Sequence, residues 1–310
     1  MDGSVPGAAA TYSHWRDAPE PPPGLAADTS TEMTLKAAAD AGRWLDPYHV
    51  VCNNHIDADG LLSLAIACRP EVAIPHARLL IGAAEAGDFS SWPGREPFRL
   101  MLRLHQLIRD EQARGIGWEQ RSCTAVVDDL VVLIAESAQP DRERDSQVRR
   151  VEDTIARLAN RDGFSIDTYG RIAVVTWKRR HGHRSDSFLT VDDDDDLPPW
   201  AIGCAVPEHL FQLLAMETPD GTVYQLDAPR YSWARVVNLP HVPWPDLSDV
   251  RDRLQAAESG SCRWVDRPVS ARLGFVCQLA SAQGDTTAPS ALAAAHVVYA
   301  CRSALDASAV

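Results

Sequence analysis

The sequence predicts an α/β protein in which the N-terminal part carries a parallel sheet, a helical segment follows, and an α+β part completes the chain. Three observations lead to this fold class. Two short apolar runs, HVVCNN (49–54) and ARLLIGAA (77–84), have the length and composition of buried strands, and acidic residues follow each of them. Apolar residues recur at helical spacing between Phe98 and Asn160. Runs rich in β-branched residues, such as RIAVVTW, begin after Gly163.

The composition is that of a protein with a packed core and an acidic surface. The chain has 310 residues, 45% of them hydrophobic, so it can form one large domain or two small ones. Its net charge of -13 disfavours binding to polymeric nucleic acid, which requires a basic surface. No stretch approaches the roughly 20 apolar residues of a membrane span, and the seven cysteines are scattered without a CxxC pair. We therefore expect a soluble, cytoplasmic protein that binds neither membranes nor nucleic acid polymers.

Residues 1–27 are expected to form an extended arm. Several prolines disfavour both helix and strand there, because proline lacks a backbone donor and fixes φ. Within the arm, His14 and Trp15 could fold over a site, although a surface aromatic clamp is the ordinary interpretation. The arm ends where Thr29 and Glu32 have the spacing of a capping box before MTLKAAADAGRWL, so a helix is predicted to start there.

Residues 28–162 are predicted to form an α/β domain that includes the helical segment. The strand HVVCNN is followed by the polar loop HIDADG and by LLSLAIACR, whose unbroken apolar residues suit a buried helix. The second strand, 77–84, leads directly to Glu85 and Asp88. Two strands in succession thus deliver acidic residues at their carboxyl ends.

Residues 163–310 are predicted to form a second α+β domain or a continuation of the first. Strands are expected in FSIDTYG, RIAVVTW and SFLTV and as a pair around DGTVYQLD, and helices in PEHLFQLLAM, LSDVRDRLQAAE and PSALAAAHVVYACRSAL. The run from Asp192 to Asp196 is expected to be a solvated loop, because five adjacent carboxylates repel one another. A calcium site is the alternative interpretation of that run.

The segment His55-Ile56-Asp57-Ala58-Asp59-Gly60 carries the strongest chemical signal. Alternate positions in a loop direct an imidazole and two carboxylates to one side, which gives a mixed nitrogen and oxygen site suited to a divalent metal. Gly60 allows the backbone to turn tightly into the next helix. The alternative is that Asp57 and Asp59 cap the helix while His55 forms local hydrogen bonds.

This segment, within VVCNNHIDADGLLSLA, resembles the first motif of the Asp-His-His phosphoesterase superfamily. The resemblance implies a parallel α/β fold and a two-metal centre, usually holding manganese, with His55, Asp57 and Asp59 as ligands. A second motif of that family contributes an aspartate, for which Asp88 in EAGDF is the candidate. No Asp-His-His triplet follows in this chain. Together with DTSTE, AAEAGDF and YSWA, the segment also looks like a group of uncharacterised bacterial proteins that keep the first motif and lack the later ones.

Two further groups are candidates for binding a substrate. His181, His183 and Arg184 belong to KRRHGHR, a concentrated positive charge in an acidic chain, which suits a phosphate or carboxylate. A solvent-exposed hairpin turn explains this cluster nearly as well. Tyr231 and Trp233 alternate and would share one strand face as a stacking wall, with ordinary packing as the alternative.

The leading functional hypothesis is a metal-dependent enzyme that hydrolyses a phosphoester or related bond in a small anionic molecule. A divalent ion, manganese or else zinc or magnesium, would be held by His55, Asp57, Asp59 and Asp88 and would lower the pKa of bound water. His55 and Asp59 are expected to take part in the catalysis as well. A metal-dependent lyase or cyclase that uses the same site, and a non-catalytic ligand-binding descendant of the fold, are the alternatives.

Overall fold

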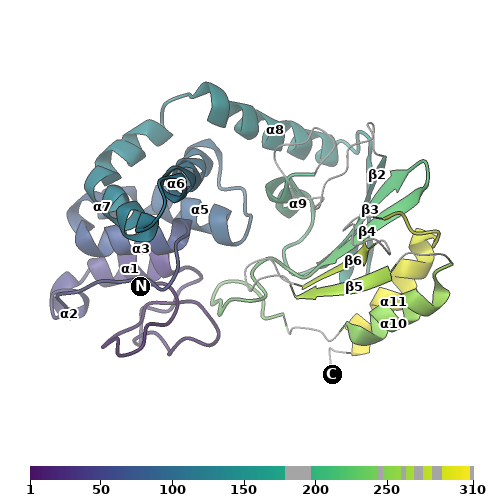
Figure 1. Cartoon of the computed structure of the whole chain (residues 1–310), viewed down its shortest axis with the longest axis horizontal. Coiled ribbons are helices and arrows are strands. Elements are labelled where there is room, and N and C mark those ends of the chain that lie inside the picture. The colour runs from purple at the N-terminus through teal and green to yellow at the C-terminus, as the bar shows by residue number, and fades with distance from the viewer. Residues whose placement is uncertain (179–196, 243–246, 260–262, 269–274, 281–287, 308–310) are drawn as a thin grey trace. The chain divides into compact units, whose positions relative to one another are not determined.

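The computed structural model shown in Figure 1 describes residues 1–178, 197–242, 247–259, 263–268, 275–280 and 288–307. The chain divides into two compact units. The first unit contains residues 1–149 and 234–240, and the second contains residues 150–233 and 241–310. The division passes through helix α8 (Arg142–Ala159), whereas the sequence analysis placed a boundary after residue 162.

The first unit is a set of helices around α3 (Ala58–Cys68). The sequence LLSLAIA gives α3 no polar face, and the helix contacts α1, α5, α6 and α7. No helix in the described part of the chain combines the length and the hydropathy needed to cross a membrane. The other elements of this unit before α8 are α1 (Ser30–Ala38), α2 (Ala41–Trp44), α4 (Pro70–Ala73), η1 (Ile74–His76), α5 (Ala77–Asp88), α6 (Arg95–Ala113) and α7 (Trp118–Ser137).

The parallel sheet predicted for the N-terminal part is wrong, since none of the described residues of the first unit belongs to a multi-residue strand. Residues 49–54 form an irregular segment in which Val50 is 80% exposed, and a strand there would lack a partner for its backbone groups. The run at 77–84 belongs to helix α5. Alanine and leucine favour a helix, and Leu80, Ala83 and Ala84 become buried at helical spacing.

The arm of residues 1–27 packs against the helices. It contains no helix, as predicted, and yet Tyr12, Leu25 and Ala27 are buried in one apolar cluster with Met33 and Ala37 of α1. Residues 234–240 complete this unit from a distant part of the sequence. A bridge pairs Trp15 with Ala234, and the Arg235 amide donates a hydrogen bond to the backbone oxygen of His14.

The second unit contains a six-stranded mixed sheet in the order β1-β2-β3-β4-β6-β5. Strands β2 and β3 are parallel, and every other neighbouring pair is antiparallel. The presence of both helices and a sheet confirms the predicted mixed fold. The strands are β1 (Phe164–Tyr169), β2 (Ile172–Lys178), β3 (Phe211–Thr218), β4 (Gly221–Asp227), β5 (Arg263–Pro268) and β6 (Phe275–Ala280).

Most of the predicted elements of the second unit are confirmed, and one is wrong. The predicted strands FSIDTYG, RIAVVTW and DGTVYQLD correspond to β1, β2 and β4. The helices α10 (Ser248–Ala257) and α11 (Ala294–Ala307) were expected, and α9 (Pro199–Ala205) was not. The helix predicted in PEHLFQLLAM is strand β3, because a strand that is buried on both faces shows no alternation to distinguish it from a buried helix. SFLTV and the acidic run at 192–196 lie outside the described residues.

A candidate metal centre

The segment HIDADG forms the start of α3. Asp57 is the N-cap residue, and its Oδ1 accepts a hydrogen bond of 2.8 Å from the Gly60 amide. A Cβ on Gly60 would lie 2.9 Å from the Asn53 side chain and 3.0 Å from Asp57 Oδ1, so a larger residue there would displace these two side chains. The capping interpretation is therefore confirmed for Asp57, and its second oxygen points elsewhere, toward His55.

Asp59, the second residue of α3, is fully buried and joins α3 to α1 through hydrogen bonds. Its two carboxylate oxygens accept hydrogen bonds of 2.8 Å from the backbone amides of Ser30 and Thr31. These amides form the N-terminus of α1, where the helix leaves donors without intrahelical partners. The start of α1 is itself fixed by the Thr29 side chain, which accepts from the Glu32 amide and so confirms the predicted cap.

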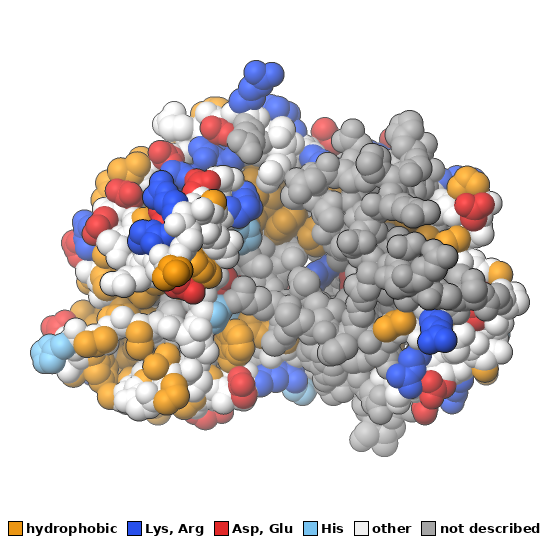
Figure 2. Space-filling model, in the orientation of Figure 1, with side chains coloured by type: hydrophobic (Ala, Val, Ile, Leu, Met, Phe, Trp, Pro, Cys, Tyr) orange, Lys and Arg blue, Asp and Glu red, His pale blue; other side chains and the backbone are white. Residues whose placement is uncertain are grey.

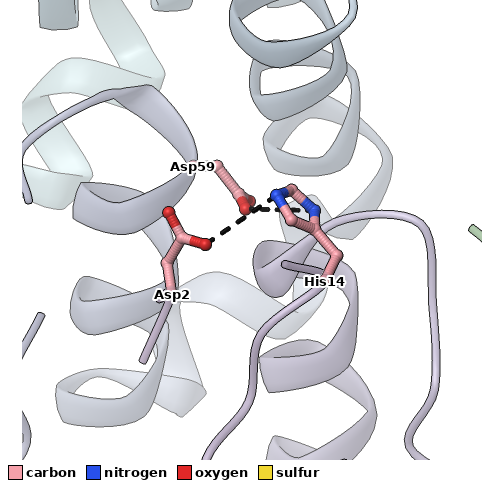
Figure 3. Close-up of side chains that lie close together, drawn as sticks. All are labelled: Asp2, His14 and Asp59. Atoms are coloured by element: carbon pink, nitrogen blue, oxygen red, sulfur yellow. Dashed lines mark ion pairs between the residues drawn. The ribbon is translucent and has the colours of Figure 1, made fainter. Parts of the chain in front are cut away.

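His14 is buried, so the interpretation of this residue as part of a surface clamp is wrong; its ring lies beside the Asp59 carboxylate (Figure 3). Its Nδ1 is 2.7 Å from the backbone oxygen of Asp28. A carbonyl oxygen only accepts hydrogen bonds, so Nδ1 carries a proton, and in the neutral ring Nε2 carries the lone pair. This Nε2 is 3.4 Å from Asp88 Oδ2 and 3.8 Å from Asp2 Oδ1.

Asp28 in turn fixes the position of the chain around His14. Its Oδ1 accepts hydrogen bonds of 2.6 Å and 3.0 Å from the amides of Val237 and Asn238. Both the main chain of Asp28 and the amide of Arg235 bond to His14, so the histidine is held between the end of the arm and residues 234–240. Such outer hydrogen bonds are what orients a metal-binding imidazole.

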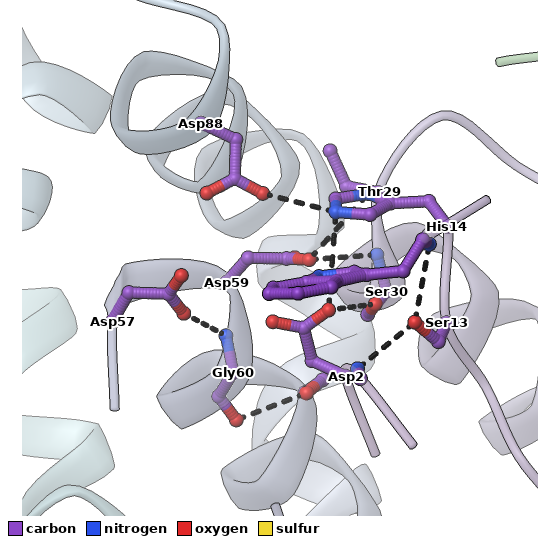
Figure 4. Close-up of polar contacts among 12 residues, drawn as sticks. Asp2, Ser13, His14, Thr29, Ser30, Asp57, Asp59, Gly60 and Asp88 are labelled. Carbon is purple, nitrogen blue, oxygen red and sulfur yellow. Dashed lines mark hydrogen bonds and ion pairs between the residues drawn. The ribbon is translucent and has the colours of Figure 1, made fainter. Parts of the chain in front are cut away.

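The Asp2 carboxylate is buried and lies within 3.8 Å of the Nε2 atoms of both His14 and His55; Figure 4 shows it next to Ser30. Its Oδ1 accepts a 2.8 Å hydrogen bond from the Ser30 hydroxyl, and its Oδ2 is 2.8 Å from His55 Nε2. The sequence analysis missed Asp2. The residue stands at the start of an arm without periodicity, and nothing in its neighbours Met1 and Gly3 indicates a ligand.

His55 is held by two carboxylates and is the more open of the two histidines. Its Nε2 is 2.8 Å from Asp2 Oδ2 and 3.0 Å from Asp57 Oδ2, and the Trp15 ring lies 4.9 Å from the imidazole. Burial lowers the pKa of His55, but the hydrogen bonds to Asp2 and Asp57 outweigh burial and raise the pKa to about 9. The side chain keeps 17% of its surface exposed, so solvent reaches it.

These residues form two groups of potential metal ligands that share one carboxylate. The first group is Asp2, His14 and Asp59, and the second is Asp2, His55 and Asp57; within each group the ligand atoms lie within 4.8 Å of one another. Burial and the nearby Asp2 raise the pKa of Asp59 to about 6. Repulsion among carboxylates in a buried site is relieved when a cation binds.

Of the four predicted ligands, His55 and Asp57 thus fall in one group, Asp59 falls in the other, and Asp88 lies beside His14 from the last residue of α5. The prediction that they meet at the carboxyl ends of parallel strands is wrong, because they meet at the N-terminal end of a helix. Tyr231 and Trp233 lie in a turn and not on a strand face, and both are buried in the second unit, which favours the packing alternative. The predicted substrate groups His181, His183 and Arg184 lie outside the described residues.

The fold and this cluster define a protein of two units, one helical and one built on a mixed sheet, whose helical unit contains a buried His/Asp cluster of the metal-ligand type. The chain belongs to the family of unknown function DUF6687, whose model matches residues 1–307. Neither the curated proteins nor the solved structures contain a match to it.

Proposed function

We propose that the protein is a metal-dependent enzyme that hydrolyses a phosphoester or related bond in a small anionic molecule. The observation that carries this proposal is the pair of His/Asp groups that share Asp2. The resemblance of HIDADG to the first motif of the Asp-His-His phosphoesterases supports the same chemistry. The net charge of -13 favours a small substrate over a nucleic acid polymer.

The donor atoms fit a divalent cation. Each group offers one imidazole nitrogen and two carboxylates, a set that suits Mn²⁺ and also accepts Zn²⁺, while Mg²⁺ prefers oxygen alone. A bound divalent ion would lower the pKa of a water molecule and stabilise negative charge on the scissile group. With three carboxylates and two imidazoles in the combined cluster, the protein itself supplies an excess of negative charge for such an ion.

The residues of the cluster are arranged so that their roles differ. Asp59 is fixed by two backbone amides and is fully buried, which suits a rigid ligand. Asp57 uses Oδ1 as the helix cap and directs Oδ2 to His55, so the capping role leaves one oxygen to serve as a metal ligand. His55 is partly exposed and lies beside two carboxylates, so it is the ligand that places the metal within reach of solvent.

The variant Asp57→Asn tests the proposal because it separates the two roles of this residue. Asparagine is as good an N-cap as aspartate, so the start of α3 should survive, whereas an anionic ligand is lost. We expect Mn²⁺ affinity, measured by isothermal titration calorimetry on chelator-treated protein, to fall by about tenfold or more. The melting temperature without metal should change by only a few degrees, roughly the effect of a surface substitution.

The matched control is Asp40→Asn, an exposed aspartate at the start of α2 whose side chain makes no capping bond. It should bind Mn²⁺ as the wild type does. Hydrolysis of a panel of small phosphate esters should require Mn²⁺ and should be lost in Asp57→Asn. Equal metal affinity and equal turnover in Asp57→Asn would overturn the proposal. Metal binding without hydrolysis of any ester would favour a lyase, a cyclase or a non-catalytic binding protein.

A further inference from the structure

A pocket of about 560 Å³ lies in the first unit, beside the candidate metal centre. Its volume is within the range of about 300–1,000 Å³ typical of small-molecule sites. One wall is the beginning of the arm, including Met1, Gly3 and Tyr12; the other wall is the connection between α2 and α3, from Leu45 to Cys52. Figure 2 shows hydrophobic side chains gathered over the arm and α2, at the lower left of this face.

The pocket and the metal centre share a wall. Met1 and Gly3, which line the pocket, are the chain neighbours of Asp2. A Cβ on Gly3 would lie only 1.9 Å from Asn54 Oδ1, and Gly3 has a φ of +77°, so this contact requires glycine. The same Asn54 oxygen is 2.6 Å from His55 Nδ1. One polar residue therefore separates the arm wall of the pocket from a candidate metal ligand.

The lining is mostly apolar. In the described part of the chain, its two basic groups are the Met1 amine, which donates a 2.6 Å hydrogen bond to the Cys52 backbone oxygen and whose pKa is lowered by burial, and the exposed imidazole of His49. Alanine, valine, proline and tyrosine side chains dominate it, and the described residues that line it include no lysine or arginine. Asp46 contributes a carboxylate that would repel a second negative charge. The Tyr12 hydroxyl is already used, since it donates a 2.7 Å hydrogen bond to the backbone oxygen of Trp44. These features favour an uncharged ligand surface with few hydrogen-bonding groups.

We propose that this pocket receives the uncharged, largely apolar body of the substrate, while the anionic group of the same molecule extends past the exposed Asn54 to His55, the solvent-accessible histidine of the metal centre. This inference rests on the proposed function and adds the class of substrate. An anionic ester of an aromatic or branched aliphatic alcohol has this chemistry, whereas an ester of a highly hydroxylated sugar would leave buried hydroxyl groups unpaired.

The test uses two probes on the full chain, so that the pocket and the metal centre are measured separately. N-phenyl-1-naphthylamine, a neutral dye that fluoresces in apolar surroundings, reports the pocket without metal. Its displacement by 1-naphthyl phosphate, with and without Mn²⁺, reports whether the two sites act together. We expect the dye to bind the wild type, and Mn²⁺ to increase the affinity for 1-naphthyl phosphate by about tenfold or more.

Three variants make the test specific. Ala67→Phe places a ring in the pocket from α3 and should weaken dye binding by about tenfold. Val50 is 80% exposed at the rim, so Val50→Asp and Val50→Arg should both fold and both weaken the dye. The control is Ile116→Asp, a fully exposed apolar residue of the same unit that does not line the pocket, and it should leave dye binding unchanged.

The outcomes distinguish the pocket from the proposed function. Absence of dye binding, or equal binding in a folded Ala67→Phe variant, overturns the pocket as a ligand site. Tighter metal-free binding of 1-naphthyl phosphate in Val50→Arg would show that the pocket holds the anion, which also overturns the inference. If Mn²⁺ binds but does not strengthen 1-naphthyl phosphate binding, the two sites are unconnected and the inference fails while the metal centre stands. If Mn²⁺ does not bind at all, the proposed function itself fails.

Discussion

Asp59 in the first unit and Asp227 in the second are both fully buried carboxylates, and their surroundings differ. Asp227 is met by Gln225, whose Nε2 is 2.9 Å from both oxygens, and by Arg230 at 3.3 Å. Asp59 accepts hydrogen bonds from two backbone amides, and the carboxylate of Asp2 lies close to it. Burial raises the pKa of both residues, but Arg230 opposes the shift at Asp227 whereas Asp2 increases it at Asp59.

The difference shows two ways in which a fold can accommodate a buried charge. In the second unit, the guanidinium of Arg230 forms an ion pair with Asp227 and balances its charge. The first unit brings Asp2, Asp57 and Asp59 together with two imidazoles, which leaves an excess of negative charge in a region shielded from water. The Asp227–Arg230 pair therefore balances its charge within the protein, whereas the carboxylates around Asp59 are suited to binding a cation from solution.

The largest expected effect is a loss of stability when the buried ion pair between Asp227 and Arg230 is broken. Asp227→Ala leaves Arg230 buried without its carboxylate and should lower the free energy of unfolding by about 3–5 kcal/mol, with or without Mn²⁺. Urea denaturation measures this change. The double variant Asp227→Ala/Arg230→Met removes both charges and should recover much of the loss. If the single variant is as stable as the wild type, the pair is not what accommodates Asp227.

A somewhat smaller change in stability is expected when Mn²⁺ binds to the first unit. Mn²⁺ at about 100 times its dissociation constant should stabilise the first unit by about 2.7 kcal/mol. Hydrogen exchange followed by NMR locates the effect, because protection should increase at the amides of Ser30, Thr31 and Gly60. Amides of the sheet, such as that of Leu213, serve as the control and should change little. An equal increase in both units would contradict the assignment of the metal centre to the helical unit.

The smallest effect is a pH dependence in the metal-free protein. The pKa of His55 is raised to about 9 from an ordinary value of 6.5, so folding favours the charged imidazole. Its contribution to stability is fully present below the unfolded pKa of 6.5 and is lost as the pH rises toward 9. Urea denaturation in chelator between these values should show the decline, and His55→Gln should flatten it. An unchanged slope in His55→Gln would assign the decline to another group.

Local patterns predicted the parts of the molecule that depend on local chemistry. The cap at Thr29, the loop HIDADG at the start of a buried helix, and helices α10 and α11 all follow from short-range spacing. The strands at 49–54 and 77–84 were wrong because a short apolar run is ambiguous until its partners are known. Helix α5 and strand β3 are the two opposite outcomes of that ambiguity.

Of the five residues in the two groups of potential ligands, three were predicted as metal ligands from the sequence. His55, Asp57 and Asp59 are close in sequence, so their alternation was visible. Asp2 and His14 come from an arm whose prolines indicated only irregular structure, and their place in the cluster depends on how the arm packs on α1 and α3. Such long-range packing leaves no periodic pattern in a single sequence.

The return of residues 234–240 to the helical unit has a consequence for how the protein is made. The amides of Arg235, Val237 and Asn238 bond to His14 and Asp28, across more than 200 residues of intervening chain. During synthesis these donors leave the ribosome only after most of the sheet-forming residues, so the helices can fold early while the surroundings of His14 stay incomplete. A nascent or truncated chain that ends before residue 234 would therefore contain the helices of the first unit. It would lack the backbone donors that hold His14 and Asp28 in place.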